Sequence, residues 1–280
     1  MGKLEIAIPS NILEDCQSLS AKSQKLSLIA RSASIFQIKK IHIYKVKRKD
    51  ESKFISLLLN YLVTPQYLRK KSFPISDDLK FAGALPPLKI PSHLVSKELS
   101  SFTNSQPRQG LILKYIQKTN SSIIDLGLSK LGILHGKFPI GHIITVVPFG
   151  FHSNKFISVK QSTPNKYWGY EVNIVNSFSI LSESSNFDFK IITTKSGENI
   201  HHIYDSLFNS VNTKMRMKIL LVFGSPTSGV LELLKKEKIF INFNDFLLLN
   251  LFPNQAVETI RSEEAILGTL SIINMMIKTS

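Results

Sequence analysis

The sequence has little cysteine, little acidic charge and no long apolar run. A single cysteine, Cys16, among 280 residues excludes an internal disulfide and a zinc site built from several cysteines. The C-terminal stretch "ILGTLSIINMMI" is interrupted by polar residues and is shorter than the roughly 18 residues of a membrane span. The N-terminus "MGKLEIAIPSN" lacks the long apolar core of a signal peptide. We therefore expect a soluble, cytoplasmic protein.

Acidic side chains number 20 against 35 lysines and arginines, which gives a net charge of +15. This excess favours a polyanionic partner, with nucleic acid before an anionic membrane surface. We predict that two basic clusters contact RNA phosphates, although a charge run can also be a solvated face. The clusters comprise Lys47 and Arg48 in "KKIHIYKVKRK", and Arg69, Lys70 and Lys71 after "TPQY". Candidate base-stacking aromatics are Tyr67, Tyr167, Trp168 and Tyr170, of which Trp168 can equally belong to the core.

Several common catalytic motifs are also missing. "VFGSPTSGVLEL" runs from an apolar strand into a glycine-bounded loop, but Val230 follows Gly229 where a P-loop carries lysine. No G-x-G-x-x-G follows the early strands, and no Gly-x-Ser-x-Gly elbow is present. His201 and His202 are adjacent and cannot share one helix face, so no metal is expected. What remains is a loop at the carboxyl end of a parallel strand, where α/β proteins commonly bind small ligands.

The apolar pattern predicts α/β structure at both ends of the chain. "LEIAIP" and "KIHIY" are typical of strands, and Leu26, Ile29, Ala30 and Ala33 between them have the spacing of one helix face. The predicted apolar face of a second helix, in "SKFISLLLNYLVT", comprises Phe54, Leu57, Leu58, Tyr61 and Leu62. Near the C-terminus, "FDFKIITT", "KILLVFG" and "DFLLLN" are nearly continuous apolar runs, typical of strands buried on both faces of a parallel sheet.

The middle of the chain has a different pattern. After the rigid "PPLKIPSHL", short segments such as "GLILKYI", "SSIIDLGL", "GHIITVVPF" and "KFISVK" alternate with Gly, Pro, Asn and Ser. This alternation predicts a small all-β module, for which an OB-type barrel is favoured and an SH3-like barrel also fits. We therefore predict one α/β domain, residues 1–90 and 164–280, interrupted by an RNA-binding barrel at residues 91–163.

Several segments together resemble the SPOUT superfamily of RNA methyltransferases, specifically its archaeal and eukaryotic branch of RNA uridine-N3 methyltransferases. In order along the chain, they are "IAIPSNIL", "IARSASIFQIKKIHIY", "YLVTPQYLRKKSFPISDDLKFAGALPPLKIPSHL", "YWGYEV" and "PNQAVETIRSEEAIL". The middle module falls where that branch carries an inserted OB-like barrel. The resemblance implies an α/β domain with a trefoil knot that binds S-adenosylmethionine. It also implies a homodimer that methylates ribosomal or other large RNA.

The resemblance further implies which residues bind the cofactor. They are Thr194 and Ser196, Gly224, Leu249, Asn250 and Leu251, and then Asn254, Ile260 and Arg261. In the family's usual "TSERG" an arginine precedes the glycine, whereas Ser196 precedes Gly197 here and Lys195 is a candidate substitute. Apolar residues such as Leu249 would bind adenine through backbone N–H and C=O groups.

For catalysis, the resemblance implies roles for Arg31 and Glu264. Arg31 in "IARSASIF" matches the arginine that the superfamily has on its first helix. We predict that it binds RNA phosphate or stabilises a deprotonated base, and a solvated helix arginine is the alternative. Glu264 in "IRSEEA" is a candidate general base, while Glu263 and Glu264 also suit the first turn of a helix. The competing function is a non-catalytic RNA-binding or ribosome-assembly protein with the same fold.

Overall fold

The computed structural model describes residues 3–94, 96, 100, 102–103, 106–151, 153–211 and 217–277. The chain forms two compact units, one of Met1–Leu62, Asp78–Pro87 and Tyr170–Ser280, the other of Val63–Asp77 and Leu88–Gly169. No helix in the described part of the chain is long and apolar enough to cross a membrane.

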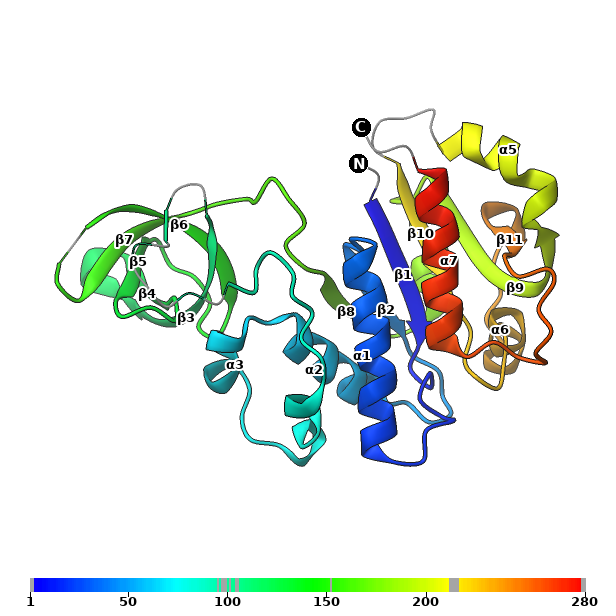
Figure 1. Ribbon diagram of the computed structural model, residues 1–280, viewed down its shortest axis with the longest axis horizontal. Coiled ribbons are helices and arrows are strands. Elements are labelled where there is room, and N and C mark those ends of the chain that lie inside the picture. The colour runs from blue at the N-terminus through cyan, green and yellow to red at the C-terminus, as the bar shows by residue number, and fades with distance from the viewer. Residues whose placement is uncertain are drawn as a thin grey trace. The chain divides into compact units, whose positions relative to one another are not determined.

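The first unit is built on a six-stranded parallel sheet (Figure 1). Its strands are β1 (Lys3–Pro9), β2 (Lys40–Tyr44), β8 (Glu171–Val175), β9 (Phe189–Asn199), β10 (Lys218–Val222) and β11 (Leu247–Asn250). They follow the order β11-β9-β10-β1-β2-β8, and every neighbouring pair is parallel. The three apolar runs near the C-terminus form β9, β10 and β11, so the predicted α/β class with a parallel sheet is confirmed.

Helices cover both faces of this sheet. On one face α1 (Leu19–Ile35) and α7 (Ser262–Met276) lie side by side (Figure 1). The predicted α1 face of Leu26, Ile29, Ala30 and Ala33 is completely buried. On the other face are α4 (Phe178–Ser182) and α6 (Val230–Glu237), and α5 (Ile200–Val211) follows β9. Burial on both faces explains why the strands are apolar throughout.

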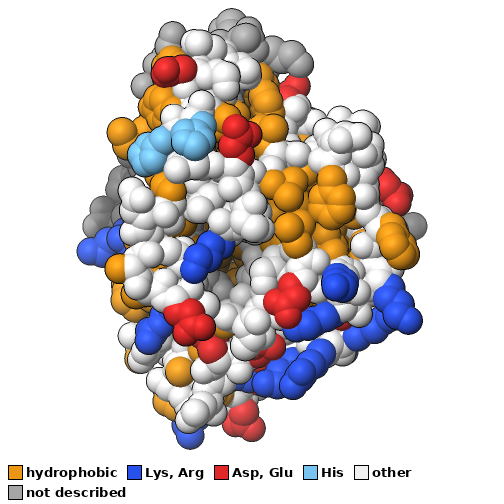
Figure 2. Space-filling view, turned by 90° about the vertical axis from the view of Figure 1, so that its right-hand side faces the viewer, with side chains coloured by type: hydrophobic (Ala, Val, Ile, Leu, Met, Phe, Trp, Pro, Cys, Tyr) orange, Lys and Arg blue, Asp and Glu red, His pale blue; other side chains and the backbone are white. Residues whose placement is uncertain are grey.

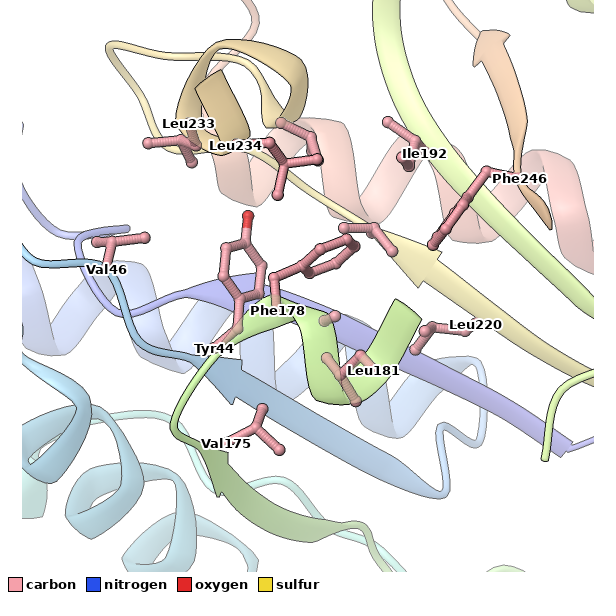
Figure 3. Close-up of a cluster of buried hydrophobic side chains, with 13 residues drawn as sticks. Tyr44, Val46, Val175, Phe178, Leu181, Ile192, Leu220, Leu233, Leu234 and Phe246 are labelled. Carbon is pink, nitrogen blue, oxygen red and sulfur yellow. The ribbon is translucent and has the colours of Figure 1, made fainter. Parts of the chain in front are cut away.

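A cluster of buried side chains joins α4 and α6 to the sheet (Figure 3). Phe178 of α4 packs edge-on against Tyr44 of β2, with the ring centroids 5.2 Å apart. The Tyr44 hydroxyl is buried and donates a 2.7 Å hydrogen bond to the carbonyl oxygen of Phe223. Phe223 directly follows β10, so this bond fixes the start of the loop that leaves that strand.

The second predicted helix is present as α2 (Ser52–Val63), but only Leu58 and Leu62 of its predicted apolar face are buried. The apolar residues that it buries are Ile55, Leu58, Leu59 and Leu62. The predicted Phe54, Leu57 and Tyr61 are only half-buried. Because Leu57–Leu59 are all apolar, the spacing fits two overlapping stripes, and packing selects the one centred on Ile55 and Leu59.

The second unit contains a closed five-stranded barrel, as the middle pattern predicted. Its strands are β3 (Arg108–Ile116), β4 (Ser121–Asp125), β5 (Leu131–His135), β6 (Ile143–Phe151) and β7 (Phe156–Gln161). They close in the order β3-β4-β5-β7-β6, with β5 and β7 parallel and the other pairs antiparallel. Its interior includes Ile112, Ile124, Leu134, Val146 and Ile157.

The bounds of the two units differ from the predicted ones at residues 88–90 and 164–169 and, over the longest stretch, at residues 63–77. This segment contains α3 (Gln66–Ser72), and it belongs to the barrel unit. The Tyr67 hydroxyl donates to the carbonyl oxygen of Gln109 (2.9 Å), and Lys71 forms an ion pair with the buried Asp125. These contacts attach α3 to β3 and β4.

Candidate functional site

A cavity of about 590 Å³, the first cavity, lies beside the carboxyl ends of β10 and β11. Ile192 of β9 pairs with Leu248, but Glu198 pairs with Leu249, so residues 193–197 bulge out of the ladder. The cavity is lined by residues 193–196, 223–229, 249–252 and 258–260, and by Glu232, Gln255, Ser262 and Ala265. On the face on the side of α5 and β11, basic and acidic side chains lie next to a mainly uncharged centre (Figure 2). Its size and place suit a small ligand.

Side-chain hydrogen bonds hold the β9 and β11 segments of the first cavity together. The Asn250 amide donates to the carbonyl oxygen of Lys195 (3.0 Å) and accepts from the N–H of Phe252 (3.1 Å). The hydroxyl groups of Thr194 and Ser196 form a hydrogen bond with each other (3.1 Å). The Asn250 side chain therefore links the loop after β11 to the β9 bulge, and these hydrogen bonds stabilise the backbone around it.

Glu14, which follows β1, holds the β10 loop. Ser225 donates to Glu14 Oε1 (2.7 Å), Thr227 donates to the same oxygen, and Asn11 donates to Oε2 (3.1 Å). Burial acts to raise the pKa of Glu14, but these hydrogen bonds outweigh it and hold the pKa below its usual range. The ionised carboxylate thus fixes one wall of the first cavity.

Gly224 lets the same loop fold back on itself. A Cβ at this position would lie 2.7 Å from the carbonyl oxygen of Ser228 and 2.9 Å from Gly229 Cα. Both atoms belong to the backbone, so no side chain can rotate away to make room. At Gly229 an added Cβ would meet nothing within 4 Å. The tight approach at Gly224 therefore shapes the cavity wall.

A second cavity of about 560 Å³ shares the wall formed by Pro226, Thr227, Thr259 and Ile260 with the first. On its far side Lys25 of α1 is 3% exposed, with its Nζ 2.8 Å from Asp15 Oδ1 and 3.3 Å from Glu263 Oε2. Glu263 lies in the first turn of α7, so the lysine joins α1 to the start of α7. Sequence reasoning missed Lys25, because a helix lysine normally faces solvent.

Most of the predicted cofactor residues gather around the first cavity. Thr194, Ser196, Gly224, Leu249, Asn250, Leu251 and Ile260 line it. Leu249 and Leu251 are buried, which leaves backbone groups as their means of contacting a ligand. Arg261 lines the second cavity, and Asn254 lines a third one of about 410 Å³, which also includes Phe252 and Val257.

The two predicted catalytic residues lie outside the linings of these three cavities. Glu264 Oε2 accepts a hydrogen bond from the backbone N–H of Arg261 (3.1 Å), so it caps the first turn of α7. Arg31 is on α1, and its Nη1 lies 3.5 Å from the carbonyl oxygen of Pro87. Within one chain, neither side chain reaches the first cavity.

The predicted RNA-contacting residues fall in both units. Lys47 and Arg48 are exposed in the loop after β2. Lys70 is exposed on α3, whereas Arg69 donates from Nε to the carbonyl oxygen of Thr64 (2.9 Å) and Lys71 pairs with Asp125. The latter two contacts stabilise the barrel unit.

Two of the predicted base-stacking aromatics are unsuited to that role. Tyr167 is 7% exposed and Tyr170 is 4% exposed, and the Tyr170 hydroxyl donates to the carbonyl oxygen of Leu59 (3.0 Å). The ring of Tyr67 lies 4.3 Å from the guanidinium of Arg108. Burial leaves Tyr167 and Tyr170 little ring surface for a base, and the Tyr67 ring packs against a cation of the same unit.

No cluster of three or more His, Cys, Asp or Glu side chains that could hold a metal ion is found in the described ranges. His201 and His202 are both exposed on α5. The polar groups around the first cavity are backbone groups, hydroxyls and amides, together with the charged Lys195, Glu232 and Glu258.

Comparison with known proteins assigns the chain to a family. The family described as "Putative RNA methyltransferase" matches residues 3–273. A 28S rRNA (uridine-N(3))-methyltransferase of Drosophila melanogaster is 29% identical over 96% of this chain, which spans 61% of the length of that relative. The human protein of the same name is 27% identical over 96% of this chain and 77% of its own length. The chain thus belongs to this RNA methyltransferase family, which implies that a methyl donor is its cosubstrate.

Proposed function

We propose that the protein is an S-adenosylmethionine-dependent RNA methyltransferase that methylates uridine N3 in ribosomal RNA. The observation that carries this proposal is the first cavity, where three loops at the carboxyl side of a parallel sheet meet in a chain of an RNA methyltransferase family. The base and its atom follow from the names of the fly and human relatives.

The residues present fit S-adenosylmethionine. The cavity volume of about 590 Å³ falls within the usual range of small-ligand pockets. Backbone groups of Leu249 and Leu251 would hold the adenine, and Thr194 and Ser196 offer hydroxyls to the ribose or the methionine part. The close approach of Gly224 to the backbone of Ser228 and Gly229 fixes a loop conformation that a Cβ would disturb. The bound cofactor supplies a methyl group that is already activated on a sulfonium sulfur.

The strand order supports a knotted SPOUT fold. β11 pairs with β9 at one edge, and the chain then passes the loops of β9 and β10 to reach α7. We propose that this C-terminal segment, from Leu249 to Ser262, forms the trefoil knot around the cofactor. The barrel order, with its one parallel pair β5 and β7, supports an OB-like module that binds RNA.

A homodimer would give Arg31 its role in catalysis. The exposed face formed by α1 and α7 includes Leu28, which is 55% exposed, and Leu267, which is 44% exposed. Apolar side chains on two adjacent helices suit contact with a second copy of the chain. Arg31 lies one turn beyond Leu28 on α1. Docking of two such faces would place Arg31 near the first cavity of the partner, where it would stabilise a deprotonated uracil.

Calorimetry with S-adenosylmethionine and a methyl-transfer assay on ribosomal RNA test this function in two steps. We expect one cofactor site per chain, and Arg31→Ala should lower methyl transfer roughly 100-fold while leaving cofactor affinity unchanged. Arg31→Lys keeps the charge without the planar fork and should give an intermediate rate. A folded protein that binds no cofactor is instead the non-catalytic RNA-binding protein, and unchanged transfer in Arg31→Ala removes this residue from the mechanism.

A further inference from the structure

Two basic segments that are far apart in the sequence lie together on the first unit. One is the loop Lys47–Lys49 after β2, and the other is the C-terminal end of α6. The backbone N–H of Lys47 donates to Glu237 Oε1 (3.0 Å). Val46 is buried in the same cluster as Leu233 and Leu234 (Figure 3). The hydrogen bond and the shared cluster join the loop to the helix end.

The side chains on this surface carry unbalanced positive charge. Lys47, Arg48, Lys49, Lys235 and Lys238 are exposed, and none of them forms an ion pair with another described residue. Lys236 is neutralised by Glu232, with Nζ and Oε1 2.7 Å apart. The acidic residues near them in the sequence are Glu237, which accepts the N–H of Lys47, Asp50 and Asp245, so the cations are in excess. The surface therefore attracts anions.

An exposed aromatic ring adjoins these charges. Ile239 and Ile241 both pack against the cluster that contains Val46, whereas Phe240 between them is 93% exposed. Phe243, three residues on, is 49% exposed. Two large apolar rings in one short segment thus remain in contact with water. Such exposed apolar area is typical of a binding surface.

We propose that the surface formed by Lys47–Lys49, Lys235, Lys238 and Phe240 binds single-stranded RNA. A base stacks on the Phe240 ring, and the basic side chains contact the neighbouring phosphates. RNA is favoured over a protein partner because the cations on this surface outnumber its carboxylates and form no ion pair with another described residue. The proposal rests on the RNA substrate of the proposed function, and it adds a place on the first unit where part of that RNA binds. α6 begins at the wall of the first cavity and is about 12 Å long, so the surface lies one short helix away from it.

Fluorescence anisotropy with a fluorescein-labelled oligouridylate of about ten nucleotides tests the stacking. We expect Phe240→Ala to weaken binding roughly tenfold, and Phe240→Leu to weaken it equally, because leucine keeps apolar area but has no ring face. Phe240→Trp should bind at least as tightly as the wild type, and its added indole fluorescence should be quenched by the RNA. Phe81→Ala removes another exposed phenylalanine with a lysine near its ring, and should change affinity less than twofold.

The salt dependence tests the phosphate contacts. Lys47→Ala and Lys238→Ala should each lower the slope of log affinity against log salt by about one. Unchanged affinity in Phe240→Ala, wild-type affinity in Phe240→Leu, or an equal loss in Phe81→Ala would overturn the proposal. Binding to anionic phospholipid vesicles but not to the oligouridylate would also overturn it.

Failure of this surface and failure of the proposed function give different results. Cofactor calorimetry on the same variants should match the wild type, because Phe240 does not line the first cavity. If Phe240→Ala binds both oligouridylate and cofactor as the wild type does, the RNA surface is ruled out and the proposed methyltransferase function stands. If the wild-type protein binds neither oligouridylate nor cofactor, both the proposed methyltransferase function and the proposed RNA surface are ruled out.

Discussion

The first and second cavities share a wall but differ in the chemistry of their other residues. The first is lined mainly by hydroxyls, backbone and apolar groups from the loops after β9, β10 and β11. The second contains the buried Lys25 with its two carboxylate partners, Asp15 and Glu263. The first cavity offers hydroxyls and backbone groups to a ligand, whereas the ion pairs of Lys25 in the second hold α1 against the start of α7. The proposed ligand site and the Lys25 ion pairs thus lie on opposite sides of the wall that contains Thr227 and Ile260.

The largest effect on cofactor affinity should come from adding a Cβ at Gly224. Gly224→Ala places a Cβ against backbone atoms of the same loop, so the loop must move and cofactor affinity should fall roughly 100-fold, equivalent to about 3 kcal/mol. Gly229→Ala is the matched control from the same loop and should bind normally. Calorimetry with S-adenosylmethionine compares the two. Equal affinities would show that this loop does not shape the cofactor site.

On the second cavity, Lys25→Met should mainly change stability. It leaves the carboxylates of Asp15 and Glu263 without their buried partner, so the free energy of unfolding should fall by about 3 kcal/mol. Lys22→Met, on the same helix, removes a more exposed ion pair with Glu51 and should cost less than about 1 kcal/mol. Urea denaturation measures both. Similar losses in the two variants would mean that the Lys25 contacts have no special role.

Asn250 lines the first cavity and Asn254 lines the third, so substitutions of the two residues distinguish these cavities. Asn250→Ala loses the hydrogen bonds to Lys195 and Phe252, and we expect cofactor affinity to fall about tenfold. Asn254→Ala should change it less than about twofold, because Asn254 lines only the third cavity among the three. The prediction from resemblance gave both residues the same role. Equal losses in titration calorimetry would restore that prediction.

The ionised state of Glu14 makes the wall of the first cavity sensitive to acid. Since the folded pKa lies below the usual 4.5, the stabilisation is complete above that value and is lost as pH falls through the folded pKa. Cofactor affinity should therefore be constant between about pH 7 and 5 and weaken below about pH 4.5. Glu14→Gln should bind a few-fold more weakly at pH 7 and lack the acid-dependent fall. An identical pH profile in the variant would exclude Glu14 as the cause.

The smallest effect concerns Cys16 in the second cavity. Burial and the neighbouring Asp15 raise the pKa of the Cys16 thiol to about 11. The thiol is therefore protonated at neutral pH, and its alkylation by iodoacetamide should keep accelerating up to about pH 11. Asp15→Asn should lower the pKa and speed the reaction at pH 8. A rate that levels off by about pH 9 would show an ordinary, unperturbed thiol.

Much of the fold follows from local patterns. The α1 face of Leu26 to Ala33 and the apolar strands β9 to β11 are set by periodicity and continuous hydrophobicity, which survive in the structure. The predicted face of α2 was right at Leu58 and Leu62 only, because three successive leucines fit two stripes. The attachment of residues 63–77 to the barrel depends on contacts of Tyr67 and Lys71 with distant strands, which no local pattern contains.

The candidate site was predictable in a different way. Motif and resemblance indicated the loops at Thr194, Gly224 and Asn250, and the structure brings them to one cavity. The groups that hold those loops were missed, because Glu14 meets Ser225 and Thr227 only after the chain has folded over more than 200 residues. Lys25 was missed because its burial is decided by α7, and a lone helix lysine carries no signal of its partner.

The claim that the first cavity delivers a methyl group to RNA is tested most directly by a single transfer measurement. The protein is incubated with large-subunit ribosomal RNA and S-adenosylmethionine that carries a tritiated methyl group, and the RNA is then digested to nucleosides. We predict tritium in N3-methyluridine, lost with Gly224→Ala and retained with Gly229→Ala. A folded protein that binds the cofactor in this cavity but leaves the RNA unlabelled would contradict the account.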